Sequence, residues 1–122
     1  MEAAANGTVL RSAELEIRPY EFLALVGGRP LRLTVRELQL LIALAERAGR
    51  IVSREELYAA VWGEPWRKSD RSVDVYVGKL RQKLEVTSPR WRYIHTHFGF
   101  GYRFAPEPRP ASPWPTPAQG PQ

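Results

Sequence analysis

The side chains with the clearest chemistry lie between residues 69 and 84. Four apolar residues in this segment recur at intervals of four, three and four positions, the spacing of one stripe on a helix: Val73, Val77, Leu80 and Leu84. The opposite side of such a helix displays a mixed set of side chains: Arg71, Ser72, Val75, Lys79 and Gln82, flanked by Tyr76 and Lys83. Arg and Lys can donate to guanine, Gln can pair with adenine, and Val can touch a thymine methyl group. The pattern predicts a helix, beginning near Ser69 and Asp70, that reads base edges in a DNA groove.

Positive charge is concentrated in the same part of the chain. Residues 67–103 contain nine Lys or Arg and three acidic residues, a net charge of +6, whereas residues 1–66 carry −1. A polyanion is the natural partner of such a segment. The alternative interpretation is a solvated surface helix, and Val75, in the middle of the polar face, argues against it.

Catalytic and metal-binding residues are hard to find. The chain has no cysteine, which excludes disulfides, thiol catalysis and zinc–thiolate sites. His95 and His97 would face the same way on a strand and could bind a metal, but no acidic residue lies beside them in the sequence. There is no Ser-His-Asp candidate and no glycine-rich phosphate loop before a helix. We therefore expect no enzymatic activity, no metal and no cofactor.

The sequence also lacks signals for a membrane. No apolar run approaches the ~18 residues that a spanning helix needs, and the N-terminus has no signal-peptide core. We expect a cytoplasmic protein with no membrane partner.

The elements around this helix can be placed from periodicity and caps. Short antiparallel strands are expected at 9–11, 13–18, 22–26 and 31–33, with a turn at Gly27 and Gly28. Residues 34–37 and 53–56 each have the pattern of a capping box, in which a Ser or Thr and a Glu cap the helix start reciprocally. The first helix has an apolar stripe of Leu38, Leu41, Ile42 and Ala45, and the second carries Leu57, Tyr58, Val61 and Trp62. Strands at 93–96 and 102–104, joined by residues 97–101, complete the fold.

This order of elements predicts one domain with two extensions. Residues 1–7 are expected to be a flexible leader, and residues 8–105 the folded domain. Residues 106–122 are rich in proline and are expected to be a disordered tail.

Four blocks of sequence, in order and at matching spacing, resemble the effector domain of OmpR/PhoB-type response regulators of bacterial two-component systems. The blocks are 33–38 (LTVREL), 52–57 (VSREEL) with 61–63 (VWG), 71–77 (RSVDVYV) with 79–81 (KLR), and Thr96 with 99–104 (GFGYRF). The resemblance covers residues 8–105. It implies an α+β fold, a winged helix-turn-helix with an N-terminal antiparallel sheet, three helices and a C-terminal wing hairpin. Members of this family also carry a phospho-acceptor receiver domain ahead of this module, and these 122 residues do not include one.

The function that the resemblance implies is sequence-specific binding of double-stranded promoter DNA for transcription regulation in the nucleoid. The third helix would enter the major groove, and the wing would reach the minor groove. By position, Ser72, Val75 and Lys79 would contact bases, and Gln82 joins them on the same face. Arg71, Tyr76 and Arg81 would contact phosphates, together with Lys83 at the edge of the face.

Two further contacts follow from the resemblance. The loop before the third helix matches the family's RNA polymerase loop, so Trp66, Arg67 and Lys68 could contact polymerase; equally, Trp66 could cover the domain's own core. Head-to-tail self-association on direct repeats is implied, with half-sites about 10–11 bp apart.

The wing and one helix position depart from the family's usual pattern. Gly78 stands where a basic residue is common, and Phe98 stands where an Arg often enters the minor groove. The wing therefore offers His97, Phe98 and Phe100. Phe98 could pack on sugars, wedge at a base step or fold back on the domain; we expect it to fold back, leaving Arg92 and Arg103 to contact the flanking phosphates.

One other class of function fits the same fold. A winged-helix module can act through protein contacts, by docking on RNA polymerase or a regulator. A docking helix should present apolar or acidic anchors, whereas the third helix here presents Arg71, Lys79 and Lys83. This basic face favours DNA.

Overall fold

The N-terminal part of the fold is a four-stranded antiparallel sheet. The computed structural model describes residues 8–110, so the expected leader at 1–7 and the tail beyond residue 110 lie outside the described residues. The strands run in the order β1-β2-β3-β4: β1 (Leu10–Ser12), β2 (Leu15–Arg18), β3 (Leu23–Val26) and β4 (Arg29–Pro30), with a 3-10 turn η1 (Pro19–Glu21) between β2 and β3. The turn at Gly27 and Gly28 is confirmed, but the prediction of a strand at 31–33 is wrong, because the last strand of this sheet is Arg29–Pro30. The pairing of β3 with β4 ends at Pro30, after which the buried Leu31 leads toward the first helix.

Helix α2 (Val35–Glu46) begins with the expected capping box. The Thr34 hydroxyl accepts a hydrogen bond from the Glu37 backbone, and the Thr34 backbone donates to the Glu37 carboxylate at 2.9 Å. Its buried surface is wider than the predicted stripe, because Leu40 and Leu44 are also fully buried. Packing on both α4 and β7 explains why one narrow stripe is not enough.

Helix α3 (Arg54–Trp62) forms only half of its expected capping box. The Ser53 hydroxyl accepts a hydrogen bond from the Glu56 backbone, as predicted. The Glu56 carboxylate does not reach back, however; it pairs with Arg47 at 3.0 Å and with Arg50 at 2.5 Å. Two guanidinium groups compete successfully with one backbone N–H for this carboxylate. Gly63, in the left-handed conformation, ends the helix.

Helix α4 (Ser72–Thr87) confirms the stripe on which the sequence argument depends. Val73, Val77, Leu80 and Leu84 are all buried. The helix begins at Ser72, a little later than expected, because the Asp70 carboxylate accepts a hydrogen bond from the Ser72 backbone at 2.8 Å and holds the preceding residues in a turn.

The second sheet has the order β5-β7-β6, from β5 (Ile51–Val52), β6 (Trp91–His97) and β7 (Gly101–Pro108). A bulge between Arg92 and Ile94 lets the consecutive residues Tyr93 and Ile94 both face the interior. Both strands of the hairpin are longer than predicted. In particular, β7 continues past residue 105, where the sequence analysis ends the folded domain.

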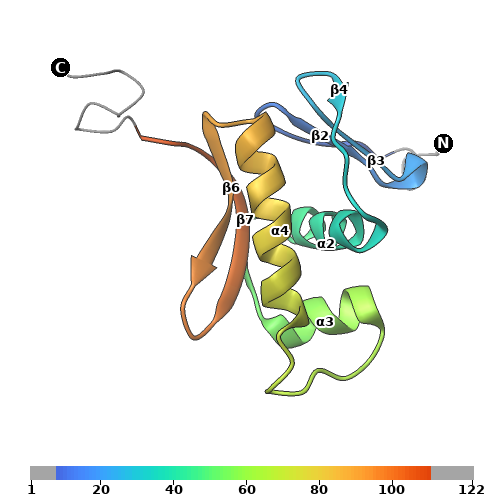
Figure 1. The fold of residues 1–122 in the computed structure, drawn as a ribbon, viewed down its shortest axis with the longest axis vertical. Helices are drawn as coiled ribbons and strands as arrows, with labels where there is room; N and C mark the ends of the chain where they lie inside the picture. The colour runs from blue at the N-terminus through green and yellow to red at the C-terminus, as the bar shows by residue number, and fades with distance from the viewer. Residues whose placement is uncertain (1–7, 111–122) are drawn as a thin grey trace.

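Figure 1 shows how these elements surround α4, which lies between the β6–β7 hairpin and α2. Helix α3 lies near the N-terminal end of α4, and the four-stranded sheet lies near the other end. The tip of the hairpin projects at the same end as the N-terminus of α4 (Figure 1). Within residues 8–110, one hydrophobic core joins the two sheets and helices α2, α3 and α4, with Ile17, Leu41, Leu57, Leu80 and Phe104 among its buried members.

Candidate nucleic-acid interface

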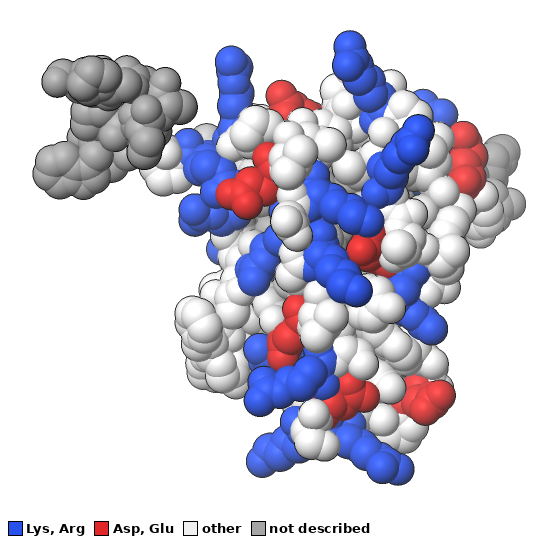
Figure 2. Space-filling model, in the orientation of Figure 1, with Lys and Arg blue, Asp and Glu red and all other residues white. Residues whose placement is uncertain are grey.

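The outward face of α4 gathers the predicted base-reading residues. Val75 is 49% exposed, Arg71, Lys79 and Gln82 are exposed, and Ser72 is partly buried in the first turn. Figure 2 shows Lys and Arg side chains concentrated over α4, on the face turned to the viewer, with fewer acidic ones between them. The buried stripe on the other side fixes the rotation of the helix, so this face is presented in one orientation.

Tyr76 lies at one edge of this face and is partly buried. Its ring packs edge-on against Trp62 of α3, with 5.7 Å between ring centroids. The Lys79 ammonium lies 5.2 Å from the centroid of the Tyr76 ring, a cation–π distance. Trp62 and Tyr76 thus support Lys79 from beneath.

Arg81 lies at the other edge and joins α4 to the hairpin. Its guanidinium donates to the Thr96 hydroxyl at 2.7 Å and to the Ile94 carbonyl at 3.4 Å, both on β6. Arg81 therefore has a structural role in addition to the phosphate contact expected from the sequence.

Lys83 forms an ion pair with a buried carboxylate. Its ammonium lies 2.7 Å from the carboxylate of Glu37, a side chain only 2% exposed. Burial raises the pKa of the Glu37 carboxyl, but hydrogen bonds from Lys83 and from the Thr34 backbone outweigh it, so this pKa lies below its usual value. In the sequence, Glu37 fits the pattern of a helix cap alone, and nothing local indicates this ion pair.

A polar network that no sequence pattern indicates connects α3, α4 and the hairpin. The carboxylate of Asp74 accepts hydrogen bonds from Arg54, at 2.7 Å, and from the hydroxyl of Tyr102. Burial raises the pKa of Asp74, but these two donors outweigh it and hold the pKa below its usual value. The guanidinium carbons of Arg54 and Arg81 lie 5.2 Å and 5.7 Å from the centroid of the Tyr102 ring. This network sets the position of the hairpin relative to the outward face of α4.

The two histidines of the hairpin lie on one face of their strand, as predicted. His97 accepts a hydrogen bond from Arg103 at 3.1 Å, and Arg103 also lies 3.3 Å from Glu107. His95 is bonded to the Ala105 carbonyl at 2.8 Å. Among residues 8–110, no group of three or more His, Cys, Asp or Glu is arranged to hold a metal ion. Arg92 is exposed on β6.

The tip of the hairpin corrects the expectation for Phe98. This ring is 87% exposed and Phe100 is 71% exposed, so neither folds back on the domain. The loop that joins β6 to β7 projects away from α4 (Figure 1). Residues 97–101 of the tip contain no Lys or Arg, so the wing presents two exposed aromatic rings there. Figure 2 shows white side chains on the projecting part of the hairpin that faces the viewer.

The loop between α3 and α4 presents its basic residues and holds its tryptophan. Trp66 is partly buried, and its indole N–H donates to the Asp70 carbonyl at 3.2 Å within the same loop. Arg67 and Lys68 are exposed. Trp66 thus braces the turn that precedes α4.

This arrangement agrees with comparisons to known proteins. Residues 28–104 match the family described as transcriptional regulatory protein, C terminal. The chain belongs to this family of OmpR/PhoB-type winged-helix domains. The family consists of DNA-binding regulatory domains and is not an enzyme class.

Two curated relatives illustrate the match in sequence. Transcriptional regulatory protein CseB of Streptomyces coelicolor is 37% identical over 82 residues, which are 67% of this chain and 35% of the relative. The alkaline phosphatase synthesis regulator PhoP of Bacillus subtilis is 35% identical over 83 residues, 68% of this chain and 35% of that protein. The chain spans about a third of the length of these relatives.

Solved structures match over more of their length. The DNA-binding domain of CpxR from Escherichia coli has a TM-score of 0.74 and 31% identity, covering 81% of this chain and 97% of that one. The DNA-binding domain of RstA from Klebsiella pneumoniae, solved in complex with the RstA box, has a TM-score of 0.74 and 32% identity over 82% of this chain and 99% of that one. The winged-helix prediction is therefore confirmed. Within the described part of the winged-helix domain, no helix is both long and apolar enough to span a bilayer.

Proposed function

We propose that this winged-helix domain binds promoter DNA in a sequence-specific way and thereby regulates transcription in the cytoplasm. The observation that carries the proposal is the outward face of α4, where Val75, Lys79 and Gln82 stand exposed on a helix that a buried stripe holds rigidly. An α-helix of this kind fits the major groove, where every base pair shows a distinct pattern of donors and acceptors. The solved relative RstA, in complex with its DNA box, supports this assignment.

The proposed contacts divide into two sets. Ser72, Val75, Lys79 and Gln82 contact bases, and these few contacts choose the site. Phosphate contacts supply most of the affinity, and they come from basic and polar residues around the face: Arg71, Tyr76, Arg81, Arg92 and Arg103. Lys83 does not belong to the second set, because its ammonium is paired with Glu37.

The wing is proposed to reach the minor groove through its aromatic tip. Phe98 and Phe100 are exposed at the end of the molecule where α4 begins. Apolar side chains at such positions contact sugars or wedge between base pairs. A Phe98→Ala variant with unchanged DNA affinity would remove the tip from the interface.

Salt dependence tests the proposal as a whole. A sequence selected from a random duplex library serves as the cognate DNA, and its affinity is measured at several salt concentrations. With about five phosphate contacts per protomer, the plot of log K against log salt should have a slope of roughly −4 to −5. A slope shallower than about −2 would favour the protein-docking alternative.

Lys79 is expected to contribute more to the choice of sequence than to general affinity. Its ammonium lies at the centre of the outward face, above the Tyr76 ring. Replacing it with alanine should reduce the preference for cognate over scrambled duplex by about 1–3 kcal/mol, the value of one good base contact. Equal weakening on both duplexes would make Lys79 a phosphate contact instead.

The loop before α4 is proposed as a contact for RNA polymerase, through the exposed Arg67 and Lys68. Trp66→Ala, which releases the brace on this loop, should leave DNA binding nearly intact and lower transcription from a reconstituted promoter. A large fall in melting temperature without a specific transcription defect would assign Trp66 to stability alone.

Head-to-tail binding on direct repeats is the last part of the proposal. It predicts cooperative occupation of two half-sites about 10–11 bp apart. Independent occupation at that spacing would contradict it.

A further inference from the structure

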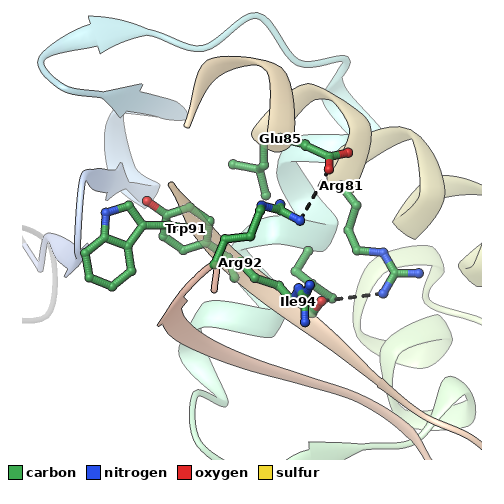
Figure 3. Close-up of a pocket in the computed structure, with 8 residues that line it drawn as sticks. Arg81, Glu85, Trp91, Arg92 and Ile94 are labelled. Atoms are coloured by element: carbon green, nitrogen blue, oxygen red, sulfur yellow. Dashed lines mark hydrogen bonds and ion pairs between the residues drawn. The ribbon is translucent and has the colours of Figure 1, made fainter. Parts of the chain in front are cut away.

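A hollow between the C-terminal half of α4 and the start of β6 is lined by an unusual set of charges. Its volume is about 230 Å³, and three arginines line it, Arg81, Arg92 and Arg109, with Glu85 as the acidic residue. Figure 3 shows Arg81 and Glu85 projecting from α4 toward β6, where Arg92 and Ile94 lie. Because arginine stays charged at any ordinary pH, the hollow carries a positive excess even when Glu85 is ionised.

The third arginine comes from outside the segment that matches the family. The match ends at residue 104, whereas β7 continues to Pro108 and pairs with Trp91 at the start of β6. Beyond the strand, the Arg109 backbone donates to the Arg90 carbonyl at 2.8 Å, and the Arg109 guanidinium donates to the Pro89 carbonyl at 2.9 Å. These bonds fix Arg109 at the hollow, where it lies 3.3 Å from the Glu85 carboxylate.

The hollow lies beside the proposed reading face. On α4, Arg81 and Glu85 project about a quarter turn from the line of Val75 and Gln82, at about 100° per residue. A helix about 10–12 Å across nearly fills a major groove about 12 Å wide, so its flanks face the phosphate walls of the groove. The flank that contains the hollow would meet one of these walls.

We propose that this hollow binds one backbone phosphate of duplex DNA through Arg81, Arg92 and Arg109. The site rests on the proposed DNA-binding function and adds a contact to it. Both hydrogen bonds of Arg81 to β6 use Nη1, so a guanidinium with five N–H donors can hold β6 and a phosphate together. The Glu85 side chain is 60% exposed and can turn to solvent when the phosphate takes its place beside Arg109.

Charge-matched variants test the site. Arg109→Gln removes one lining cation, and Arg90→Gln removes an exposed cation of the same strand connection that does not line the hollow. Relative to Arg90→Gln, Arg109→Gln should weaken cognate binding severalfold and make the salt slope shallower by about one unit. Glu85→Gln, which keeps all three arginines, should strengthen binding. In duplexes that carry a single neutral methylphosphonate, one flanking position should weaken the wild type and leave Arg109→Gln unaffected.

Each outcome decides between the possibilities. If the wild type shows no binding to the selected duplex, the proposed function and the site both fail. If the wild type binds and Arg109→Gln behaves like Arg90→Gln, with Glu85→Gln unchanged, the site alone is overturned. If inorganic phosphate raises the melting temperature only when Arg109 is present, while DNA affinity does not depend on Arg109, the ligand is a free anion and the DNA contact is wrong.

Discussion

Replacing Gly101 with alanine is expected to disrupt the wing and destabilise the whole domain. Gly101 has a φ of 141°, and a Cβ built there would lie 2.0 Å from the Val52 carbonyl oxygen. The backbones of Gly101 and Val52 both belong to paired strands, since β5 and β6 flank β7 at this point, so neither can move without breaking the sheet. The expected loss is about 3 kcal/mol or more, the upper range for a single substitution. Urea denaturation monitored by fluorescence measures this loss of stability.

Gly99 provides the matched control in the same turn. Its φ of +83° also favours glycine, but nothing lies within 4 Å of an added Cβ. Gly99→Ala should therefore cost only the conformational strain, about 1–2 kcal/mol. Equal effects of the two substitutions would show that the close approach to Val52 does not constrain the wing. A stable Gly101→Ala variant that no longer binds DNA would instead place Gly101 at the DNA contact itself.

Local patterns in the sequence were enough to predict some elements of the fold but not others. Periodicity was sufficient for α4, because its four buried residues occupy one stripe and no other element changes that pattern. At Thr34 the capping box forms as predicted, even though Lys83 from α4 also binds the Glu37 carboxylate. At Glu56 the cap prediction failed in its second half because Arg50 and, from the end of α2, Arg47 lie close to the carboxylate. A tertiary contact overrode a local preference there.

The C-terminal end of β7 was missed for a different reason. Pro106 and Pro108 argue against a strand, because proline cannot donate a ladder hydrogen bond. However, β5 pairs with β7 only at Tyr102 and Arg103. The later part of β7 therefore has an edge without that neighbour, where proline is tolerated. Only the sheet order reveals this, and with it the position of Arg109.

The predicted site residues also fall into two groups: those placed by helix geometry and those placed by contacts between elements. Positions on the outward face of α4 follow from helix geometry, so Val75, Lys79 and Gln82 could be placed together from the sequence. The partners of Lys83 and Asp74 lie on other helices and on the hairpin, far away in the sequence. The periodicity of one helix cannot predict such contacts. A buried glutamate facing a lysine from another helix has no local signature, because Glu37 also satisfies a capping pattern.

Replacing Lys83 with methionine is therefore expected to destabilise the fold and to leave the salt dependence of DNA binding unchanged. The substitution keeps the apolar stem and removes the ammonium, so the carboxylate of Glu37 stays buried and keeps the hydrogen bond from the Thr34 backbone but loses its charged partner. A buried group that loses its charged partner costs several kcal/mol. Because the Lys83 side chain is 40% exposed, solvent reduces the loss, and we expect about 2 kcal/mol near neutral pH.

The pH dependence of this loss gives a second, independent signature. In the wild type, the pKa of Glu37 is lower in the folded than in the unfolded protein, because the bonds from Lys83 and Thr34 outweigh burial. Its contribution to stability is thus present above the unfolded pKa and disappears as the pH falls through the folded value. Without Lys83, burial raises the folded pKa, and protonation relieves the penalty. The difference in unfolding free energy between wild type and Lys83→Met should therefore shrink as the pH falls from neutrality to below about 4.

Lys79→Met is the matched control, because it removes the same charge from the same helix at an exposed position. It should change stability by less than about 0.5 kcal/mol and show no comparable pH dependence. On DNA the order should reverse: Lys79→Met should impair binding to the selected duplex, and Lys83→Met should leave its salt slope unchanged. A Lys83→Met variant as stable as Lys79→Met, with a shallower salt slope, would return Lys83 to the phosphate contacts where the sequence placed it. The opposite result would assign the two lysines, one helical turn apart, to different tasks: Lys83 holds α4 to α2, and Lys79 reads the groove.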